Sequence, residues 1–104
     1  MIRHIVLLKA RPEVSDAHVQ GIFADLHALQ LNGLLSIHSG RSESPEQIER
    51  GYLHGFTIDF ADWDALAAYQ AHPDHKRAGA ALVAAAQGGI DGILVFDLPI
   101  TDAA

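Results

Sequence analysis

Four stretches of the chain are rich in apolar and β-branched residues, as β-strands are. These stretches are residues 2–9, 34–40, 52–60 and 92–98. In the first, IRHIVLLK, large apolar side chains fall on both faces of the predicted strand. We therefore expect both faces of that strand to be covered in the folded protein.

Between the first two strands, apolar residues recur three and four positions apart, as they do on one face of a helix. The predicted helix begins after Ser15, a residue type that caps helices, and runs to about Gln30. Its expected buried stripe consists of Val19, Ile22, Phe23, Leu26 and Leu29.

Two further helices are predicted in the second half of the chain. Asp62 is suited to cap the first of them, over residues 63–71. The second runs from Pro73 to about Gln87 and ends at a pair of glycines, Gly88 and Gly89. The side chains expected to face inward are Trp63, Leu66 and Tyr69 on the first helix and His75, Ala78, Gly79, Leu82 and Ala86 on the second.

A polar connection, RSESPEQIERG, occupies residues 41–51. Within it, residues 44–47 have the spacing of a capping box, with Pro45 at the first helical position. We therefore predict one short helical turn there. The connection lacks the glycines and the lysine of a phosphate-binding loop.

These elements follow the order β-α-β-β-α-β, which is typical of the ferredoxin-like fold. This is an α+β fold in which helices cover one face of a four-stranded antiparallel sheet. A chain of 104 residues fits a single domain, residues 1–104, and leaves nothing to cover the second face. We therefore predict a homodimer in which two subunits pack through their sheet faces and form a dimeric α/β barrel.

The two faces of the predicted sheet differ in bulk. The bulkier face, expected to meet the helices, carries His4, Val6, Leu8, His54, Phe56, Ile58, Phe60, Leu94 and Phe96. The smaller, mixed face, expected at the dimer interface, carries Ile5, Leu7, Leu53, Thr57 and Val95.

Composition narrows the range of partners. The formal net charge is −6 and the basic residues are scattered, which argues against binding to nucleic acid or to an anionic membrane. There is no cysteine, so neither disulfides nor thiolate metal sites are possible. No apolar run approaches the roughly 20 residues that span a bilayer, and the first residues lack the features of a signal peptide. We expect a soluble, cytoplasmic protein.

The most informative stretch for function is YQAHPDH, which begins at Tyr69. Proline disfavours the helical conformation at the residue before it, so the helix that carries Tyr69 should end near His72. Pro73 is then suited to begin the next helix, with His75 in its first turn. Tyr69 and His75 would thus lie on different helices, and their side chains can converge.

We expect a largely apolar pocket with a few convergent polar groups between helices and sheet, which is the usual character of a ligand site. Its predicted lining consists of Tyr69, His75, His4, His54, His72, Phe23, Leu26 and Leu82. No carboxylate is expected to face it. The other three of the seven histidines, His18, His27 and His38, are expected at the surface.

Three motifs in combination resemble the Dabb family of stress-responsive dimeric α/β-barrel proteins. They are H-I-V-L-L-K at residues 4–9, G-Y-x-H-G-F at 51–56 and Y-x-x-H-P-x-H at 69–75, followed by an apolar last strand that contains Phe-Asp. The resemblance covers residues 2–98. It implies a ferredoxin-like fold in which two subunits pack their sheets into a barrel.

A plant polyketide cyclase of this family works by intramolecular aldol condensation, without metal or organic cofactor. Its catalytic tyrosine and histidine match Tyr69 and His75, so the resemblance implies a catalytic role for this pair. Its other pocket histidines match His4 and His54. Where that cyclase places a tyrosine in its pocket, this chain has Leu26, so the polyketide substrate is not carried over.

Elementary chemistry gives the same pair a role. His75, at the start of a helix, feels the positive end of the helix dipole, and both this dipole and burial disfavour the imidazolium form. A neutral imidazole can act as a base, while Tyr69 donates a hydrogen bond to a carbonyl that becomes an enolate. We therefore predict a cofactor-free enzyme, of lyase or cyclase type, that acts on a small carbonyl compound.

Several alternatives remain open from the sequence. His75 could donate to a backbone carbonyl and only stabilise the corner, and His72 could only cap the following helix. His72 and His75, together with His4 or His54, could bind a metal through three imidazoles, although our prediction is that no metal is bound. The protein could also be a non-catalytic homodimeric binding or stress-protection module, or a cofactor-independent monooxygenase of the same barrel fold.

Overall fold

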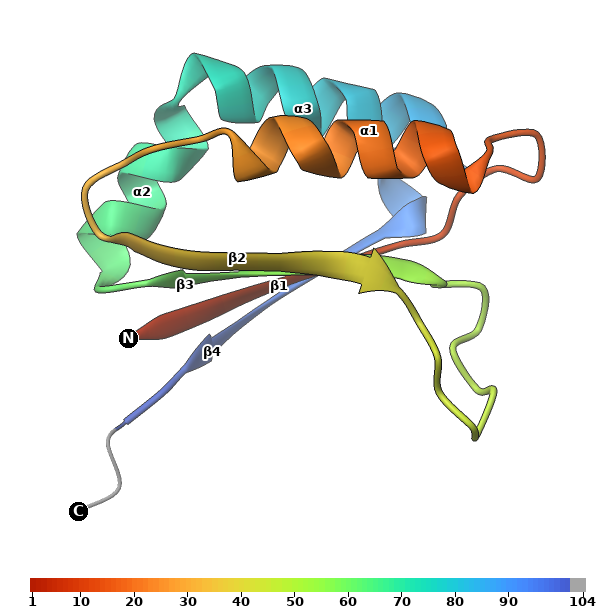
Figure 1. Ribbon diagram of the computed structural model, residues 1–104, viewed down its shortest axis with the longest axis horizontal. Helices are drawn as coiled ribbons and strands as arrows, with labels where there is room; N and C mark the ends of the chain where they lie inside the picture. The colour runs from red at the N-terminus through yellow and green to blue at the C-terminus, as the bar shows by residue number, and fades with distance from the viewer. Residues whose placement is uncertain (102–104) are drawn as a thin grey trace.

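The computed structural model describes residues 1–101 of the chain. Four antiparallel strands form one sheet in the order β2-β3-β1-β4, and the helices lie on one side of it (Figure 1). The strands are β1 (Ile2–Leu8), β2 (Leu34–Arg41), β3 (His54–Phe60) and β4 (Ile93–Pro99). The helices are α1 (Asp16–His27), α2 (Trp63–Ala71), α3 (Pro73–Ala85) and a short 3-10 turn, η1 (Gly89–Gly92). The predicted ferredoxin-like fold is confirmed.

Side-chain caps determine where the helices begin, as the sequence predicted. Ser15 and Asp62 each accept a hydrogen bond from a backbone N–H three residues later. The helix α3 ends two residues earlier than predicted, because Ala86 takes an extended conformation and pairs with Ala10 beyond the end of β1. The chain is thereby directed into η1, which the sequence did not predict.

The short helical turn predicted at residues 44–47 is wrong. Ser44 accepts a hydrogen bond from the N–H of Glu46 over 3.3 Å, which closes a tight turn and not a capping box. Gln47 and Arg50 have positive φ angles of 55° and 58°, which a right-handed helix cannot contain. The connection between β2 and β3 is therefore an irregular loop, and it projects beyond the sheet on the side away from the helices (Figure 1).

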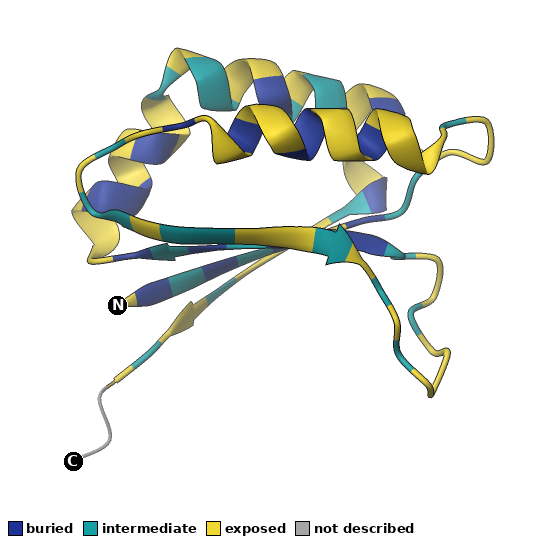
Figure 2. Ribbon diagram, in the orientation of Figure 1, coloured by how far each residue is buried: buried dark blue, intermediate teal, exposed yellow. Residues whose placement is uncertain are grey.

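The hydrophobic core lies between the helices and the sheet. Burial alternates along β3, from His54 to Phe60, and along most of β1, as expected for strands with one covered face (Figure 2). The whole predicted stripe of α1 is buried. The inward placement of Trp63 is wrong: it is 54% exposed, because Ala65 and Leu66 occupy the inner face of this first turn of α2.

The assignment of β4 to its two faces was also wrong. Val6 lies opposite Val95 and Leu7 opposite Leu94, and residues opposite each other in antiparallel strands share a face. Leu94 and Phe96 therefore lie on the open face of the sheet, and Val95 lies on the helix side. The strand is apolar at almost every position, so alternation could not choose between the two assignments, and pairing with β1 decides it.

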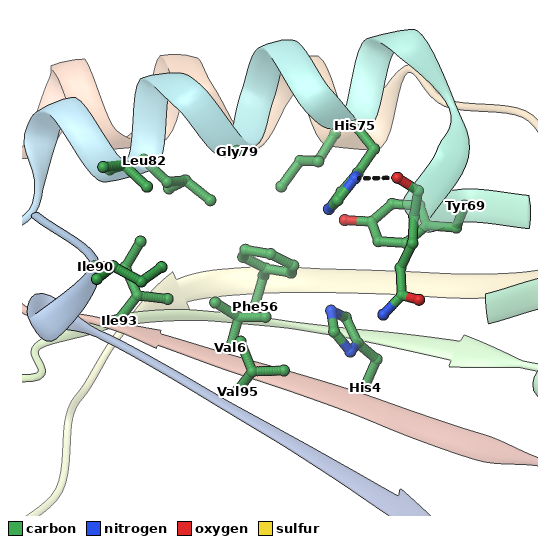
Figure 3. A pocket seen from close by; sticks show the side chains of 13 residues that line it. His4, Val6, Phe56, Tyr69, His75, Gly79, Leu82, Ile90, Ile93 and Val95 are labelled. Atoms are coloured by element: carbon green, nitrogen blue, oxygen red, sulfur yellow. Dashed lines mark hydrogen bonds between the residues drawn. The ribbon is translucent and has the colours of Figure 1, made fainter. Parts of the chain in front are cut away.

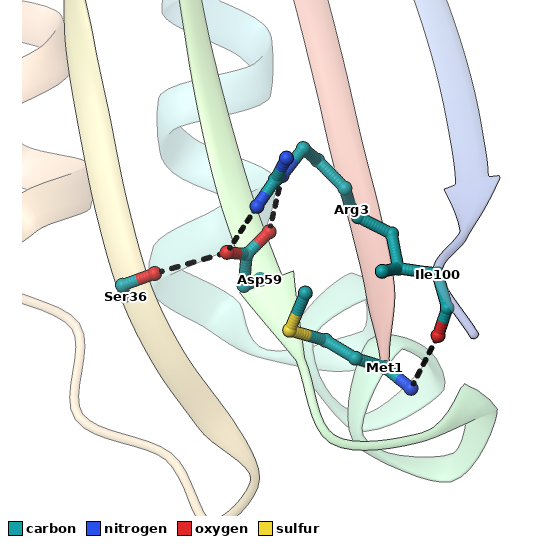
Figure 4. A network of polar contacts seen from close by, with 5 residues as sticks. All are labelled: Met1, Arg3, Ser36, Asp59 and Ile100. Atoms are coloured by element: carbon teal, nitrogen blue, oxygen red, sulfur yellow. Dashed lines mark hydrogen bonds and ion pairs between the residues drawn. The ribbon is translucent and has the colours of Figure 1, made fainter. Parts of the chain in front are cut away.

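The open face of the sheet combines an ion pair with exposed apolar side chains. Arg3 donates two hydrogen bonds to Asp59, of 2.9 and 3.1 Å, and Ser36 donates a third of 3.3 Å (Figure 4). The hydrogen bonds from Arg3 hold the pKa of Asp59 below its usual value. The exposed apolar side chains on this face are Leu7, Leu94, Phe96 and Leu98.

Candidate functional site

A cavity of about 310 Å³ lies between the helices and the sheet, on the side of the edge strand β4. Its size is at the lower end of the range for small-molecule sites. Most of the side chains that line it are apolar (Figure 3). The lining residues are His4, Val6, Leu26, Phe56, Tyr69, Gln70, His75, Gly79, Leu82, Val83, Ile90, Ile93 and Val95.

The corner between α2 and α3 brings Tyr69 and His75 together. His72 is extended, with φ −69° and ψ 135°, as expected for a residue that precedes proline. The helix α2 ends before it and α3 begins after it, so the two side chains come from different helices. Their ring centroids are 4.4 Å apart and both rings reach the cavity (Figure 3).

The protonation of His75 follows from its hydrogen bond. Its Nδ1 lies 3.1 Å from the backbone oxygen of Gln70, and a carbonyl oxygen can only accept, so Nδ1 carries the proton. Nε2 is then an unprotonated acceptor, and Figure 3 shows it on the cavity side of the ring. Burial lowers the pKa of His75 below its usual value, so the ring is neutral at pH 7.

Tyr69 presents a protonated phenol to the same space. The side chain is 1% exposed, and this burial raises the pKa of its hydroxyl above the usual value. Figure 3 shows the hydroxyl beside the ring of His75, without a hydrogen bond to any of the lining residues drawn. A donor is therefore available to a bound molecule, next to the free nitrogen of His75.

His4 forms a third polar group of the cavity and is held by a carboxylate. Its Nδ1 lies 2.6 Å from Oδ1 of Asp97 on the neighbouring strand, and its ring packs edge-on against Tyr69 at 5.8 Å. Since Nδ1 donates to Asp97, Nε2 is the nitrogen left for a ligand. As predicted, no carboxylate among residues 1–101 lines the cavity itself. The contact of Asp97 with His4 was not predicted, because the two faces of β4 had been assigned incorrectly.

Three residues predicted in the pocket lie outside the cavity. Phe23 packs against Phe56 in the core, with ring centroids 5.4 Å apart. His72 caps α3 and accepts the N–H of Asp74 over 3.0 Å. His54 lies beside the N-terminus of α1, with Nε2 3.3 Å from Asp16. Of the predicted lining, the structure brings together Tyr69, His75, His4, Leu26 and Leu82.

Several members of the site were not predicted from the sequence. Gln70, Val83, Ile90 and Ile93 line the cavity without having been predicted there. Ile90 follows two glycines, and a large apolar residue in a glycine-rich turn is the signal in the sequence that could have identified it. Asp97 could have been found from the motif Phe-Asp, once the last strand was paired with the first.

Two further properties concern the described part of the chain. Residues 1–101 contain no group of three or more His, Cys, Asp or Glu side chains arranged to hold a metal ion. Within the same residues, no helix is long and apolar enough to cross a membrane.

The fold is that of small dimeric ferredoxin-like proteins. Residues 2–100 match the family described as Stress responsive A/B Barrel Domain, and the chain belongs to this Dabb family. Two relatives from Arabidopsis thaliana are stress-response A/B barrel domain-containing proteins. HS1 is 28% identical over 92% of this chain and 86% of its own length, and At5g22580 is 30% identical over 94% and 85%.

Solved structures give the same picture of the fold. A dimeric ferredoxin-like protein of unknown function from Jannaschia sp. CCS1 is 39% identical, with a TM-score of 0.90 over 95% of this chain and 98% of its own. Two more distant structures are a hydroxynitrile lyase from Passiflora edulis and SnoaB, a cofactor-independent oxygenase from Streptomyces nogalater. The lyase is 20% identical, with a TM-score of 0.82 over 99% of this chain and 95% of its own. The oxygenase is 12% identical, with a TM-score of 0.74 over 98% of this chain and 94% of its own.

Proposed function

We propose that the cavity binds a small, uncharged carbonyl compound and that Tyr69 and His75 carry out acid–base chemistry on it without a cofactor. His75 does donate to a backbone carbonyl, that of Gln70, as the purely structural alternative also requires. The observation that supports a catalytic role is that its other nitrogen, Nε2, nevertheless lies at the cavity. The hydrogen bond to Gln70 places the proton on Nδ1 and leaves the Nε2 lone pair in the cavity, beside the hydroxyl of Tyr69. An acceptor and a donor next to each other in an apolar site can remove a proton from carbon and stabilise the resulting oxyanion.

In the proposed first step, Nε2 of His75 removes a proton from the carbon next to the carbonyl. The C–H bond breaks, its electron pair forms the enolate, and the hydroxyl of Tyr69 donates a hydrogen bond to the enolate oxygen. In an aldol reaction the enolate carbon then attacks a second carbonyl, and the proton on His75 returns to the new alkoxide. This sequence is balanced without an oxidant, a reductant or a metal.

His4 and Asp97 give the site a second fixed imidazole. Because Asp97 orients His4 through Nδ1, the Nε2 atom is available to a polar group of the ligand. The fold alone does not choose a reaction, since related structures include both a lyase and an oxygenase. The preference for acid–base chemistry therefore depends on Tyr69 and His75.

The experiment that tests this function follows the exchange of α-protons of a straight-chain methyl ketone in D₂O by NMR. The wild-type protein is expected to accelerate exchange over buffer, and His75→Ala is expected to lose on the order of 10²–10⁴-fold in rate. Tyr69→Phe removes only a hydroxyl and is expected to slow exchange more than it lowers the melting temperature. Ketone binding without any exchange would contradict the catalytic proposal and favour the non-catalytic binding module.

We also propose that the protein is a homodimer joined through the open face of the sheet. The exposed Leu7, Leu94, Phe96 and Leu98 on that face support it, as does the dimeric state of the 39% identical relative. The cavity lies on the opposite, helix-covered side, so each subunit would contain its own complete site.

A further inference from the structure

The cavity has two chemically different ends (Figure 3). Its polar groups, His4, Tyr69 and His75, gather near the corner between α2 and α3. The other end, beneath the last turns of α3, is lined by aliphatic side chains: Leu82, Ile90 and Ile93. A molecule that satisfies both ends has a polar head and an apolar tail.

None of the residues that line the cavity is an aspartate, glutamate, lysine or arginine. An ionised head would therefore lose its hydration without gaining a paired charge, which is unfavourable in an apolar site. His75 is neutral and adds no charge. The lining selects a head that is polar but uncharged, such as a ketone or an aldehyde.

Ile90 both lines the aliphatic end of the cavity and faces solvent, since its side chain is 68% exposed. Val83, which also lines the cavity, is 37% exposed. A shorter side chain at position 90 would therefore lengthen the space for a tail at this end.

Hydrogen bonds hold the segment that carries Ile90. Lys9 accepts one from the N–H of Gln87 and donates one to Gly92, each of 2.8 Å. Between these two contacts, the backbone oxygen of Asp91 accepts a hydrogen bond from the hydroxyl of Tyr52 over 3.2 Å. Because the backbone is held in this way, a variant that shortens the side chain at position 90 tests the side chain alone.

From these observations we propose that Ile90 is the specificity-determining residue of the site. It forms the end wall of the cavity and sets the greatest length of the apolar tail that an uncharged carbonyl ligand can have. This inference rests on the proposed function, since the carbonyl head must lie at Tyr69 and His75 for the tail to point toward Ile90.

The test measures the affinity of straight-chain methyl ketones of increasing length by NMR titration. For the wild-type protein, affinity should rise about three- to fourfold for each added methylene until the aliphatic end is full, and then fall. Ile90→Ala removes three carbon atoms from the end of the cavity, so the ketone that binds with the highest affinity should be a longer one. Ile48→Ala is the matched control, since Ile48 is an isoleucine that is 58% exposed and does not line the cavity.

One further variant separates this inference from the function on which it rests. Tyr69→Phe should weaken all ketones by a similar factor, about two- to tenfold, without moving the maximum. Because Ile90 and Ile48 are exposed, both alanine variants should melt within a few degrees of the wild-type protein, which checks that they are folded.

Each outcome decides the matter. A maximum that moves in Ile90→Ala and stays in Ile48→Ala supports the inference. An unchanged maximum in Ile90→Ala, or an affinity that rises through the whole series without a maximum, overturns the role of Ile90 while leaving the carbonyl site in place. If no ketone binds the wild-type protein, both the proposed function and the inference are wrong.

Discussion

At the scale of single residues, one backbone carbonyl determines the chemistry of the site. The oxygen of Gln70 fixes the proton of His75 on Nδ1, and the buried phenol of Tyr69 keeps its own proton. Asp97 fixes the proton of His4 in the same way. The two imidazoles are therefore oriented by contacts outside the cavity, which leaves Nε2 of each for a ligand.

The same burial that makes His75 a neutral base predicts a dependence of stability on pH. Burial lowers the pKa of both His54 and His75 below the usual 6.5, and Arg41 acts in the same direction on His54, whereas Asp16 partly opposes it. As the pH falls through 6.5, the unfolded chain takes up protons on these histidines before the folded protein does. Their contribution to stability is thus complete above this pH and is lost below it.

This dependence can be measured by thermal unfolding between about pH 7.5 and about pH 5.5. The melting temperature should fall on acidification, and His54→Gln should reduce the slope. His18→Gln, at an exposed position, should leave the slope unchanged. A wild-type melting temperature that stays constant or rises over this range would contradict the account.

At the scale of elements, the helix α3 covers the cavity, and one of its residues that line the cavity is a glycine, Gly79. A Cβ atom added at Gly79 would meet nothing within 4 Å, and Gly79 lines the cavity. Gly21, in the middle of α1, has the same free space but does not line it. The two glycines form a matched pair that separates helix stability from cavity shape.

Gly79→Ala and Gly21→Ala should each stabilise the protein by about 0.5–1 kcal/mol, because alanine loses less conformational entropy in a helix than glycine does. Only Gly79→Ala adds a methyl group to the cavity, so only this variant should alter the affinity for methyl ketones. The check is chemical denaturation together with NMR titration. Equal effects of the two variants on ketone affinity would show that a side chain at position 79 does not enter the ligand site.

The elements could be predicted from the sequence wherever a local rule decides them. Ser15 and Asp62 identify the starts of their helices because capping depends on residues within one turn. Pro73 identifies the corner because it restricts the residue before it. The convergence of Tyr69 and His75 could be predicted for the same reason, since it follows from the break between the two helices at Pro73.

Prediction from the sequence mostly failed where contacts between residues far apart in the chain determine the local structure. The faces of β4 depend on its pairing with β1, so Asp97 beside His4 could not be read from alternation in an apolar strand. The failure at residues 44–47 is of another kind, because it is local: Gln47 takes a positive φ angle that the capping-box spacing does not reveal. The exclusion of His54 from the cavity depends on its contact with Asp16, from another element.

At the scale of the whole molecule, the helices leave one face of the sheet open. Phe96 on that face is 61% exposed, and leucines lie around it. Apolar residues grouped in this way indicate a contact surface. We expect a dimer that buries more than about 1,200 Å² in total, the lower limit for stable interfaces.

Phe96→Asp should convert this dimer into a monomer in light scattering, because it would bury an unpaired charge at the interface. Trp63→Asp is the control. Trp63 is also an exposed aromatic residue, 54% exposed, but it lies on α2 on the other side of the sheet, so its replacement should leave the dimer intact. A wild-type protein that is monomeric at micromolar concentration would contradict the proposed assembly.

The central claim is that His75 presents an unprotonated Nε2 atom to a carbonyl ligand. A long-range ¹H–¹⁵N NMR spectrum of the histidine side chains at neutral pH tests it most directly. The account predicts that His75 is neutral with its proton on Nδ1, and that a methyl ketone shifts the Nε2 resonance. An imidazolium, a proton on Nε2, or a His75 signal that no ketone perturbs would contradict it.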